Sequence, residues 1–279
     1  MKKLTTTVKD FISLLWQDGI NFLHVFDPHS QDKDVRPYSK ELRRDGIIEI
    51  KDFLSPEACD DYKQQIEAFI AEHPNTETLE NGTFLHYRGK DDPDNPDFGM
   101  IDVAHIDRSL PSINSINDRL LVKILESATN QEIIPVKVNT YINDSITGTR
   151  GYHIDNTQPV IYKAFVYLAD VPDLSYGPYS FVKGSHRFSL YTYLNLFLNI
   201  FNRNRVNTDM PLFNKRRVKH CTGKKGTLIM SHQNAIHRGM PQEVGKKRMA
   251  LVFSYFVRSK LSYIHSSSKQ VLAERRAFA

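Results

Sequence analysis

The sequence predicts a mainly β protein with flanking helices, an α+β chain in which the helices come first. Helical patterns fill most of residues 1–135, and short apolar runs typical of buried strands dominate from Val136 onward. We expect these strands to form a double-stranded β-helix, a cupin-like jelly roll, with the N-terminal helices packed on its outside. Side chains on its inner strands would then lie in the mouth of the barrel.

The N-terminal part begins with two predicted helices. Apolar residues recur near helical spacing in both, and Ser55 is a predicted N-cap for the second, with Pro56 at its first helical position. The apolar positions are Val8, Phe11, Ile12 and Leu15 in the first helix and Tyr62, Ile66, Phe69 and Ile70 in the second.

A loop and a third helix are expected before the strands. Residues 81–98 contain several Asp, Asn, Gly and Pro residues, which predicts a long loop. Long loops in compact domains often serve as lids or binding loops. The third helix is expected from Pro111 to Ala128.

Five apolar runs predict the strands of the core. Asn139 and Tyr141 share a face of the first run, because side chains two apart in a strand point the same way. If that face is the inner one, both would contact a cosubstrate; ordinary strand residues with one exposed side are the alternative. Lys163, Phe165 and Tyr167 share a face in the same manner. The runs are residues 136–142, 161–168, 179–183, 226–231 and 249–256.

The strongest functional signal is His153-Ile154-Asp155 together with His237, which follows the fourth run. Two imidazoles and one carboxylate can occupy one face of an iron(II) ion and leave the other positions open. His153 and Asp155 point to the same side of an extended strand, and a ligand from a distant strand completes the face. A chain with 11 His and 32 acidic residues can contain His-x-Asp by chance, so the pattern alone is weak.

Arg248 strengthens the interpretation. It lies 11 residues after His237 and opens the last apolar run, where its guanidinium could hold a dicarboxylate through two parallel hydrogen bonds. Each residue also has an ordinary structural alternative: a core histidine at His153, a turn residue at His237 and a surface cation at Arg248. The occurrence of all four residues in this order favours a metal site.

The chain resembles the phytanoyl-CoA dioxygenase family of Fe(II)/2-oxoglutarate-dependent oxygenases over most of its length, from about Leu42 to Phe256. Residues 42–50 and 53–57 are similar to the opening helix, strand and second helix of that family, and residues 177–186 to its Gly-Pro and Gly-Ser-His segment. A departure is Gly239, where relatives carry a hydroxyl that helps to hold the cosubstrate.

The resemblance implies an enzyme, a 2-oxoglutarate-dependent dioxygenase. Its iron(II) ligands would be His153, Asp155 and His237, and 2-oxoglutarate would bind Arg248, with dioxygen as the second cosubstrate. The expected reaction is hydroxylation of an unactivated C–H bond, because related halogenases usually carry a small residue in place of the carboxylate of Asp155. A jelly-roll binding protein that has lost the chemistry is the alternative outside enzymes.

Composition agrees with one catalytic domain over residues 1–279: a mainly helical part with the lid loop (1–135), the β core (136–258) and a tail (259–279). The hydrophobic fraction is 40%, which is ample for a core.

The only cysteines in the sequence are Cys59 and Cys221, without disulfide or zinc spacing, which suits a reducing compartment. Neither a secretory signal nor the roughly 18 apolar residues of a membrane span is expected, so a cytoplasmic location is predicted. Oligomeric state is not readable from the sequence.

The charge is distributed unevenly and bears on the substrate. Residues 1–150 have a net charge of −9, and residues 151–279 have a net charge of +14, with the densest cluster in 215–219 and 224–225. This favours an anionic small-molecule or conjugated substrate, such as a CoA thioester, nucleotide sugar or lipid-linked glycan; a solvated surface is the alternative. His105, Arg88, Lys163 and His232 are candidate pocket residues, each with a structural or surface role as the commoner alternative.

A nucleic-acid or protein demethylase with the same metal site is the alternative among enzymes, since a positive half would suit nucleic acid. Nucleic-acid demethylases carry a second arginine shortly after the one that binds the cosubstrate, whereas Ser254 stands six residues after Arg248. No base-reading module is recognisable either. We therefore expect no nucleic-acid partner.

Residues 190–201 form an apolar insertion between the Gly-Ser-His segment and the basic cluster. The segment is too short to cross a bilayer. Because apolar helices usually pack inside, a core or lid helix is the favoured interpretation. Its basic neighbours and the first helix, which contains Trp16, leave peripheral membrane contact as the alternative.

Overall fold

The structure is a computed structural model that describes residue 12 and residues 33–88, 99–116, 118–155, 160–187, 190–201 and 208–258. The first predicted helix, apart from Ile12, and the tail at 259–279 lie outside these residues, as do residues 89–98 of the predicted lid loop.

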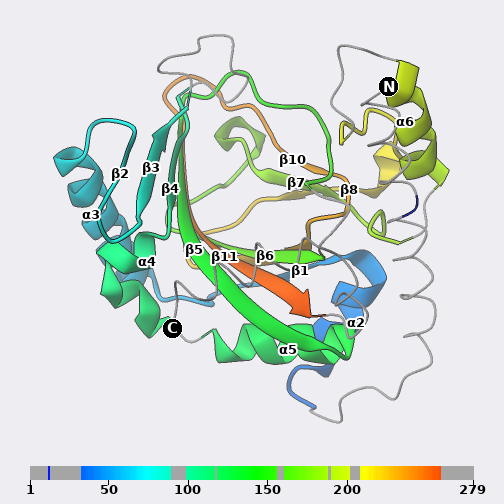
Figure 1. Ribbon diagram of the computed structural model, residues 1–279, viewed down its shortest axis with the longest axis horizontal. Coiled ribbons are helices and arrows are strands. Elements are labelled where there is room, and N and C mark those ends of the chain that lie inside the picture. The colour runs from blue at the N-terminus through cyan, green and yellow to red at the C-terminus, as the bar shows by residue number, and fades with distance from the viewer. Residues whose placement is uncertain are drawn as a thin grey trace.

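Two antiparallel sheets face each other across a buried interior (Figure 1). The large sheet has the strand order β1-β9-β6-β11-β5-β4-β3-β2, and the small sheet has the order β10-β7-β8. The strands are β1 (Ile47–Ile50), β2 (Glu77–Thr78), β3 (Phe84–Tyr87), β4 (Ile101–Ala104), β5 (Glu132–Asp144), β6 (Ile161–Tyr167), β7 (Tyr179–Val182), β8 (Val218–Cys221), β9 (Leu228–His232), β10 (His237–Gly239) and β11 (Lys247–Arg258).

Strict alternation along the strands separates the two faces of the large sheet. In β11, Leu251, Phe253 and Tyr255 belong to an apolar core on the outer face, whereas Ala250 and Val252 belong to the cluster between the sheets. Side chains in a strand alternate with a period of two, so each strand serves both cores. Arg248 has the same parity as Ala250 and therefore belongs to the inner face.

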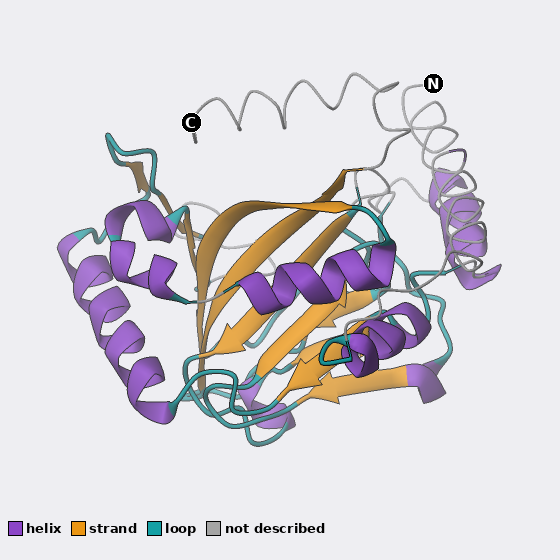
Figure 2. Ribbon diagram, turned by 90° about the horizontal axis from the view of Figure 1, so that it is seen from below, coloured by secondary structure: helices purple, strands orange, loops and turns teal. Residues whose placement is uncertain are grey.

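Helices cover the outer face, as predicted (Figure 2). The second predicted helix begins where its signals indicate: the Ser55 hydroxyl accepts a hydrogen bond of 3.2 Å from the Ala58 backbone N–H, and Pro56 is the first helical residue. The helices are α2 (Arg36–Asp45), α3 (Pro56–Glu72), α4 (Ile106–Ser109), α5 (Arg119–Thr129) and α6 (Leu190–Phe201), with 3-10 turns η1 (Pro111–Ser115), η2 (Leu174–Tyr176) and η3 (Lys215–Arg217).

Two local predictions in the N-terminal part are wrong. The predicted loop at 81–98 contains β3, in which Leu85 is fully buried because β3 pairs with β4. The helix predicted from Pro111 to Ala128 is divided into η1 and α5, because Ile116 adopts an extended conformation between them. This mainly helical part also contributes β1 to β4 to the large sheet, since pairing with distant strands outweighs weak local signals.

The apolar insertion forms helix α6, but it is not a core helix. Leu190 and Phe197 are 75% and 57% exposed, so the interpretation as a core helix is wrong. Figure 1 shows α6 at the end of the molecule that holds the small sheet, away from α3. Among the described residues, none of the helices has the length and apolar content needed to cross a membrane.

Candidate metal centre

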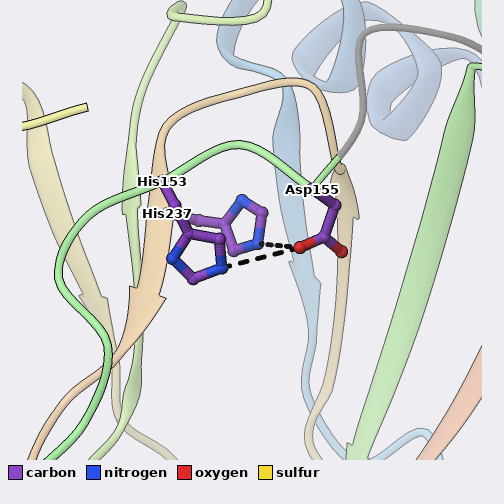
Figure 3. A group of neighbouring side chains, drawn as sticks. All are labelled: His153, Asp155 and His237. Carbon is purple, nitrogen blue, oxygen red and sulfur yellow. Dashed lines mark ion pairs between the residues drawn. The ribbon is translucent and has the colours of Figure 1, made fainter. Parts of the chain in front are cut away.

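His153, Asp155 and His237 converge on one point (Figure 3). One ligand atom from each lies within 4.8 Å of the others. The Oδ1 atom of Asp155 lies 3.5 Å from Nε2 of His153 and 3.4 Å from Nε2 of His237. Two imidazole nitrogens and one carboxylate oxygen at these separations suit a single transition-metal ion bound on one face. The structure thus brings together the three predicted ligands.

Backbone pairing brings the two histidines side by side. The N–H of His153 donates to the carbonyl of His237 at 3.0 Å, and the N–H of His237 donates back at 2.9 Å. The N–H of Asp155 donates to the carbonyl of Gln233 at 3.0 Å, which ties its segment to the end of β9. His237 itself pairs with Phe181 in β7. The ligands therefore come from extended segments that are hydrogen-bonded to one another.

Each imidazole is oriented by a backbone carbonyl. Nδ1 of His153 lies 2.8 Å from the carbonyl oxygen of Gly151, and Nδ1 of His237 lies 2.8 Å from that of Ala235. A carbonyl only accepts, so each Nδ1 carries the proton and donates it, and each Nε2 presents its lone pair. Burial lowers the pKa of His237, against the opposing effect of Asp155, which favours the neutral form needed by a ligand.

Lys163 holds the second oxygen of the carboxylate. Its Nζ lies 2.6 Å from Oδ2 of Asp155, while Oδ1 faces the histidines. Burial alone would raise the pKa of Asp155, but Lys163 and His237 hold that pKa well below its usual range, so the carboxylate is ionised. A partner of this kind orients a metal ligand and limits its rotation. The sequence placed Lys163 among candidate pocket residues but did not predict this pairing.

Arg248 lies on the inner face of β11, beside Gly239, which is two residues beyond His237 in β10. Its guanidinium donates to the carbonyl of Gly177 and, at 3.1 Å, to Oδ1 of Asn143. A Cβ atom on Gly239 would lie 3.4 Å from Nη2 of Arg248, so this glycine leaves room beside the guanidinium. Gly239 and His237 are two apart in β10 and point the same way. The guanidinium of Arg248 and the ring of His237 thus lie on the same side of β10.

Asn143, which contacts Arg248, was not among the candidate residues of the sequence analysis. It is 4% exposed and pairs with Arg248 across β5 and β11. The signal was present in the alternation, because Asn143 shares its parity with Asn139 and Tyr141.

Asn139 and Tyr141 are on the inner face of β5, which was one of the two alternatives for them. Tyr141 packs against the cluster between the sheets. Asn139 is buried; its Oδ1 accepts from the N–H of His105 at 3.4 Å, and its Nδ2 lies 3.5 Å from Asp102. A contact of either residue with a cosubstrate stays a prediction.

Arg88 and His232, two more of the candidate pocket residues, have different surroundings. Arg88 forms an ion pair of 3.1 Å with Asp102, on the strand that neighbours β5. His232 instead belongs to the outer face, where its ring packs against Tyr162 and His186 at centroid separations of 4.8 and 5.4 Å. It does not face the metal ligands.

The basic cluster of the sequence is not a single patch. Lys219 forms an ion pair of 2.9 Å with Glu49, and Lys225 forms one of 2.6 Å with Asp60. Residues 215–217 are exposed in η3, which precedes β8 at the edge of the small sheet. β7 separates β8 from β10, so the exposed cations are not beside the strand of His237.

No family model matches the chain, and no curated protein matches it either, so the resemblance to the phytanoyl-CoA dioxygenase family stays a prediction.

Solved structures are similar to the chain over most of its length at low identity. The epimerase SnoN in complex with Fe³⁺, alpha ketoglutarate and nogalamycin RO has a TM-score of 0.58 at 13% identity, covering 82% of this chain and 88% of that chain. HygX from Streptomyces hygroscopicus with nickel and 2-oxoglutarate bound has a TM-score of 0.57 at 14% identity, covering 82% and 88%. EctD from S. alaskensis with bound Fe has a TM-score of 0.57 at 15% identity, covering 83% and 80%. These similarities confirm the double-stranded β-helix core.

Proposed function

We propose that the protein is an Fe(II)- and 2-oxoglutarate-dependent dioxygenase that hydroxylates an unactivated C–H bond of a small-molecule or conjugated substrate. The observation that carries the proposal is the arrangement of His153, Asp155 and His237, with one ligand atom from each within 4.8 Å of the others. Both imidazoles present Nε2 to this point, and Asp155 presents one oxygen while Lys163 holds the other. The three-residue set leaves the remaining coordination positions open.

Similar solved structures support the same cofactors. SnoN was solved with Fe³⁺ and alpha ketoglutarate, and HygX with nickel and 2-oxoglutarate. When bound, iron(II) with 2-oxoglutarate and dioxygen supplies an oxidant strong enough to break a C–H bond. The protein would supply the ligands, the orientation of the cosubstrate and a site shielded from water.

In this proposal Arg248 would hold the far carboxylate of 2-oxoglutarate. A guanidinium matches a carboxylate through two parallel hydrogen bonds, and Asn143 restricts its position. Asn139 and Tyr141 would contribute further contacts from the neighbouring positions on the inner face. The aromatic side chains between the sheets, among them Phe165 and Tyr179, would exclude water around the cosubstrate.

The proposal is tested by cosubstrate turnover. Purified protein is incubated with 2-oxoglutarate and dioxygen, with and without added Fe(II), and succinate is measured. Iron-dependent succinate formation that is lost in His153→Ala is the expected result. A protein that binds Fe(II) and 2-oxoglutarate but forms no succinate with any substrate would be a binding protein rather than an oxygenase.

The reaction type is tested by a screen of acyl-CoA thioesters, amino acids, sugar nucleotides and lipid-linked glycans. Hydroxylation adds one oxygen atom to the product mass. Among similar structures, SnoN is an epimerase and SnoK a carbocyclase. A product of unchanged mass, or one that has lost two hydrogen atoms, would therefore retain the cofactor assignment and contradict hydroxylation.

A further inference from the structure

The inner face of the large sheet continues past β5 onto β4 and β3. Tyr141 of β5 pairs with Asp102 of β4, which pairs with His86 of β3, so the three side chains lie on one face. Leu85 and Val103, which alternate with them, are fully buried in the core under the helices. The described members of the cluster between the sheets include Tyr141 but come from neither β3 nor β4. Figure 1 shows both strands on the side of β5 away from β7 and β10. The apolar packing of the small sheet therefore ends at β5.

Asp102 is a carboxylate held in place on this end of the inner face. Nη2 of Arg88 donates to its Oδ2 at 3.1 Å, and Nδ2 of Asn139 lies 3.5 Å from its Oδ1. The side chains of Asp102 and Arg88 are 16% and 30% exposed, so their ion pair is partly buried and still reaches the surface. An ionised carboxylate can accept about four hydrogen bonds. Asp102 thus retains the capacity to accept from a ligand.

Asp102 lies close to the candidate metal centre. β4 and β6, which carry Asp102 and Lys163, are separated by β5 and β11, three strand spacings of about 4.8 Å. Burial raises the pKa of Tyr141 on β5, an effect that Lys163 opposes, and the carboxylates of Asp102 and Asp155 raise it further. The Tyr141 hydroxyl is therefore near both carboxylates. A ligand that contacts Asp102 and the metal centre would lie over Tyr141.

An aromatic pair flanks Asp102. The rings of Phe84 and His86 in β3 are stacked, with centroids 5.7 Å apart and planes at 27°. Phe84 is 38% exposed and belongs to none of the apolar clusters. The negative face of an aromatic ring attracts the C–H groups on the apolar side of a sugar ring, and a carboxylate beside it accepts from the sugar hydroxyls. The two features together suit a ligand that is both ring-shaped and rich in hydroxyl groups.

We propose that Asp102, Phe84 and His86 bind the substrate and that the group they bind is a hydroxylated ring, the glycosyl unit of a sugar nucleotide or glycan. The ion pair of Asp102 with Arg88 has no net charge, so an uncharged hydroxyl suits it better than an ammonium group or a carboxylate. An acyl chain would remove water from the pair without replacing its hydrogen bonds. This inference rests on the proposed function, because it names the substrate class of the same site.

The test measures binding without turnover. The full chain, with and without Ni(II) and 2-oxoglutarate, is mixed with UDP-glucose, UDP-galactose or GDP-mannose. UDP and GDP are the matched probes that lack the sugar, and palmitoyl-CoA is the acyl probe. Saturation-transfer NMR identifies the probe protons that contact the protein, and calorimetric titration gives the dissociation constants. Ni(II) stands in for iron because it does not support the oxidation.

We expect saturation of the sugar protons of at least one nucleotide sugar, which should bind more tightly than its nucleotide diphosphate. Asp102→Asn keeps the shape of the side chain but removes the charge that strengthens its hydrogen bonds, so affinity for that nucleotide sugar should fall about tenfold. Phe84→Ala should weaken it roughly threefold or more through loss of the ring face. The matched control is Asp144→Asn, at an exposed ion pair with Lys247, which should leave the affinity unchanged.

Three outcomes overturn the proposal: none of the nucleotide sugars binds, saturation is confined to the nucleotide protons, or Asp102→Asn and Asp144→Asn have equal affinities. Tighter binding of palmitoyl-CoA than of every nucleotide sugar overturns it as well. Circular dichroism checks the folding of each variant, and Phe84→Ala decides the matter if Asp102→Asn does not fold. Failure of the proposed function is distinguishable, because it would abolish iron-dependent succinate formation and leave the binding of a nucleotide sugar intact.

Discussion

The two faces of the large sheet are made by the same strands but differ in the polar groups that they carry. On the outer face, Leu251, Phe253 and Tyr255 of β11 pack under the helices. On the inner face, the same strand carries Arg248, and β5 beside it buries Asn139 and Asn143. Buried polar groups cost free energy unless each has a partner. The inner face therefore combines apolar packing between the sheets with a set of partnered, oriented polar groups, whereas apolar burial dominates the outer face.

This comparison predicts that substitutions on the two faces have separable effects. Changes on the inner face should alter binding of metal and cosubstrate with a modest effect on folding. Changes on the outer face should lower the free energy of unfolding and leave binding by the remaining folded protein intact.

The largest effect is expected from Asp155→Ala. It removes one of three ligands and leaves Lys163 without its carboxylate, so tight binding of Fe(II) and succinate formation should both be lost. Metal content and calorimetric titration with Fe(II) under anaerobic conditions measure this. The matched control is Leu251→Ala on the outer face, which should cost about 2–5 kcal/mol of stability and retain one metal per folded chain. Similar metal affinity in Asp155→Ala and the parent protein would reject the ligand assignment.

The next effect is expected from Lys163→Met. Residues that orient a metal ligand typically contribute 10–100-fold in metal affinity or activity, and Lys163 holds Oδ2 of Asp155 at 2.6 Å. We expect metal affinity to fall by about tenfold or more, with partial recovery in Lys163→Arg. Lys247→Met removes a lysine from an exposed ion pair with Asp144 and should change nothing. Equal metal affinities for Lys163→Met and Lys247→Met would show that the lysine only fills space.

A smaller and more selective effect is expected from Arg248→Gln. Loss of a charge-assisted hydrogen bond costs roughly 1.5–3 kcal/mol, so the apparent affinity for 2-oxoglutarate should fall by about tenfold or more while metal affinity stays the same. Arg248→Lys should recover part of it, because a lysine keeps the charge but not the paired donors. Arg258 is a partly exposed arginine, paired with Glu132, at the far end of the same strand, and Arg258→Gln is the control. An unchanged saturation curve in Arg248→Gln would place the anchor of the cosubstrate elsewhere.

The smallest effect concerns acid stability and comes from the outer face. Burial lowers the pKa of His186 to about 4 and holds that of His232 well below its ordinary value. Both histidines titrate near pH 6.5 in the unfolded chain. The unfolded state thus binds more protons between these values, and the free energy of unfolding should decrease as the pH falls from 6.5 to about 4.

Urea denaturation at intervals between pH 7.5 and 4.5 measures this slope, which His186→Gln should reduce. The carboxylate of Asp45, with its pKa lowered to about 2 by Arg44 and Lys183, loses its contribution only at lower pH and does not interfere. An unchanged slope in His186→Gln would mean that other groups control acid stability.

The sequence by itself predicted β5, β6, β7, β9 and β11 and the placement of His153 and Asp155 on one side, because both depend on short-range periodicity. A spacing of two residues in an extended segment predicts that His153 and Asp155 lie on one side. The face that carries Arg248 followed only from the structure, where Arg248 has the same parity as Ala250 between the sheets. The cap at Ser55 is equally local. The expected continuous helix after Pro111 failed because burial of Ile113 and Ile116 outweighs a local pattern.

Tertiary structure alone decided the partners of these residues. Asn143 and Arg248 are 105 positions apart in the sequence, and their hydrogen bond depends on the register of β5 against β11. Lys163 reaches Asp155 because the backbone N–H of Asp155 is bonded to the carbonyl of Gln233, directly after β9, the strand that pairs with β6. The apolar composition of α6 predicted a helix but not its outward orientation, because hydrophobicity favours removal from water without specifying which surface provides it. The hydrogen bonds of Asn195 to Leu212 and of Asn199 to Asp209 hold that orientation.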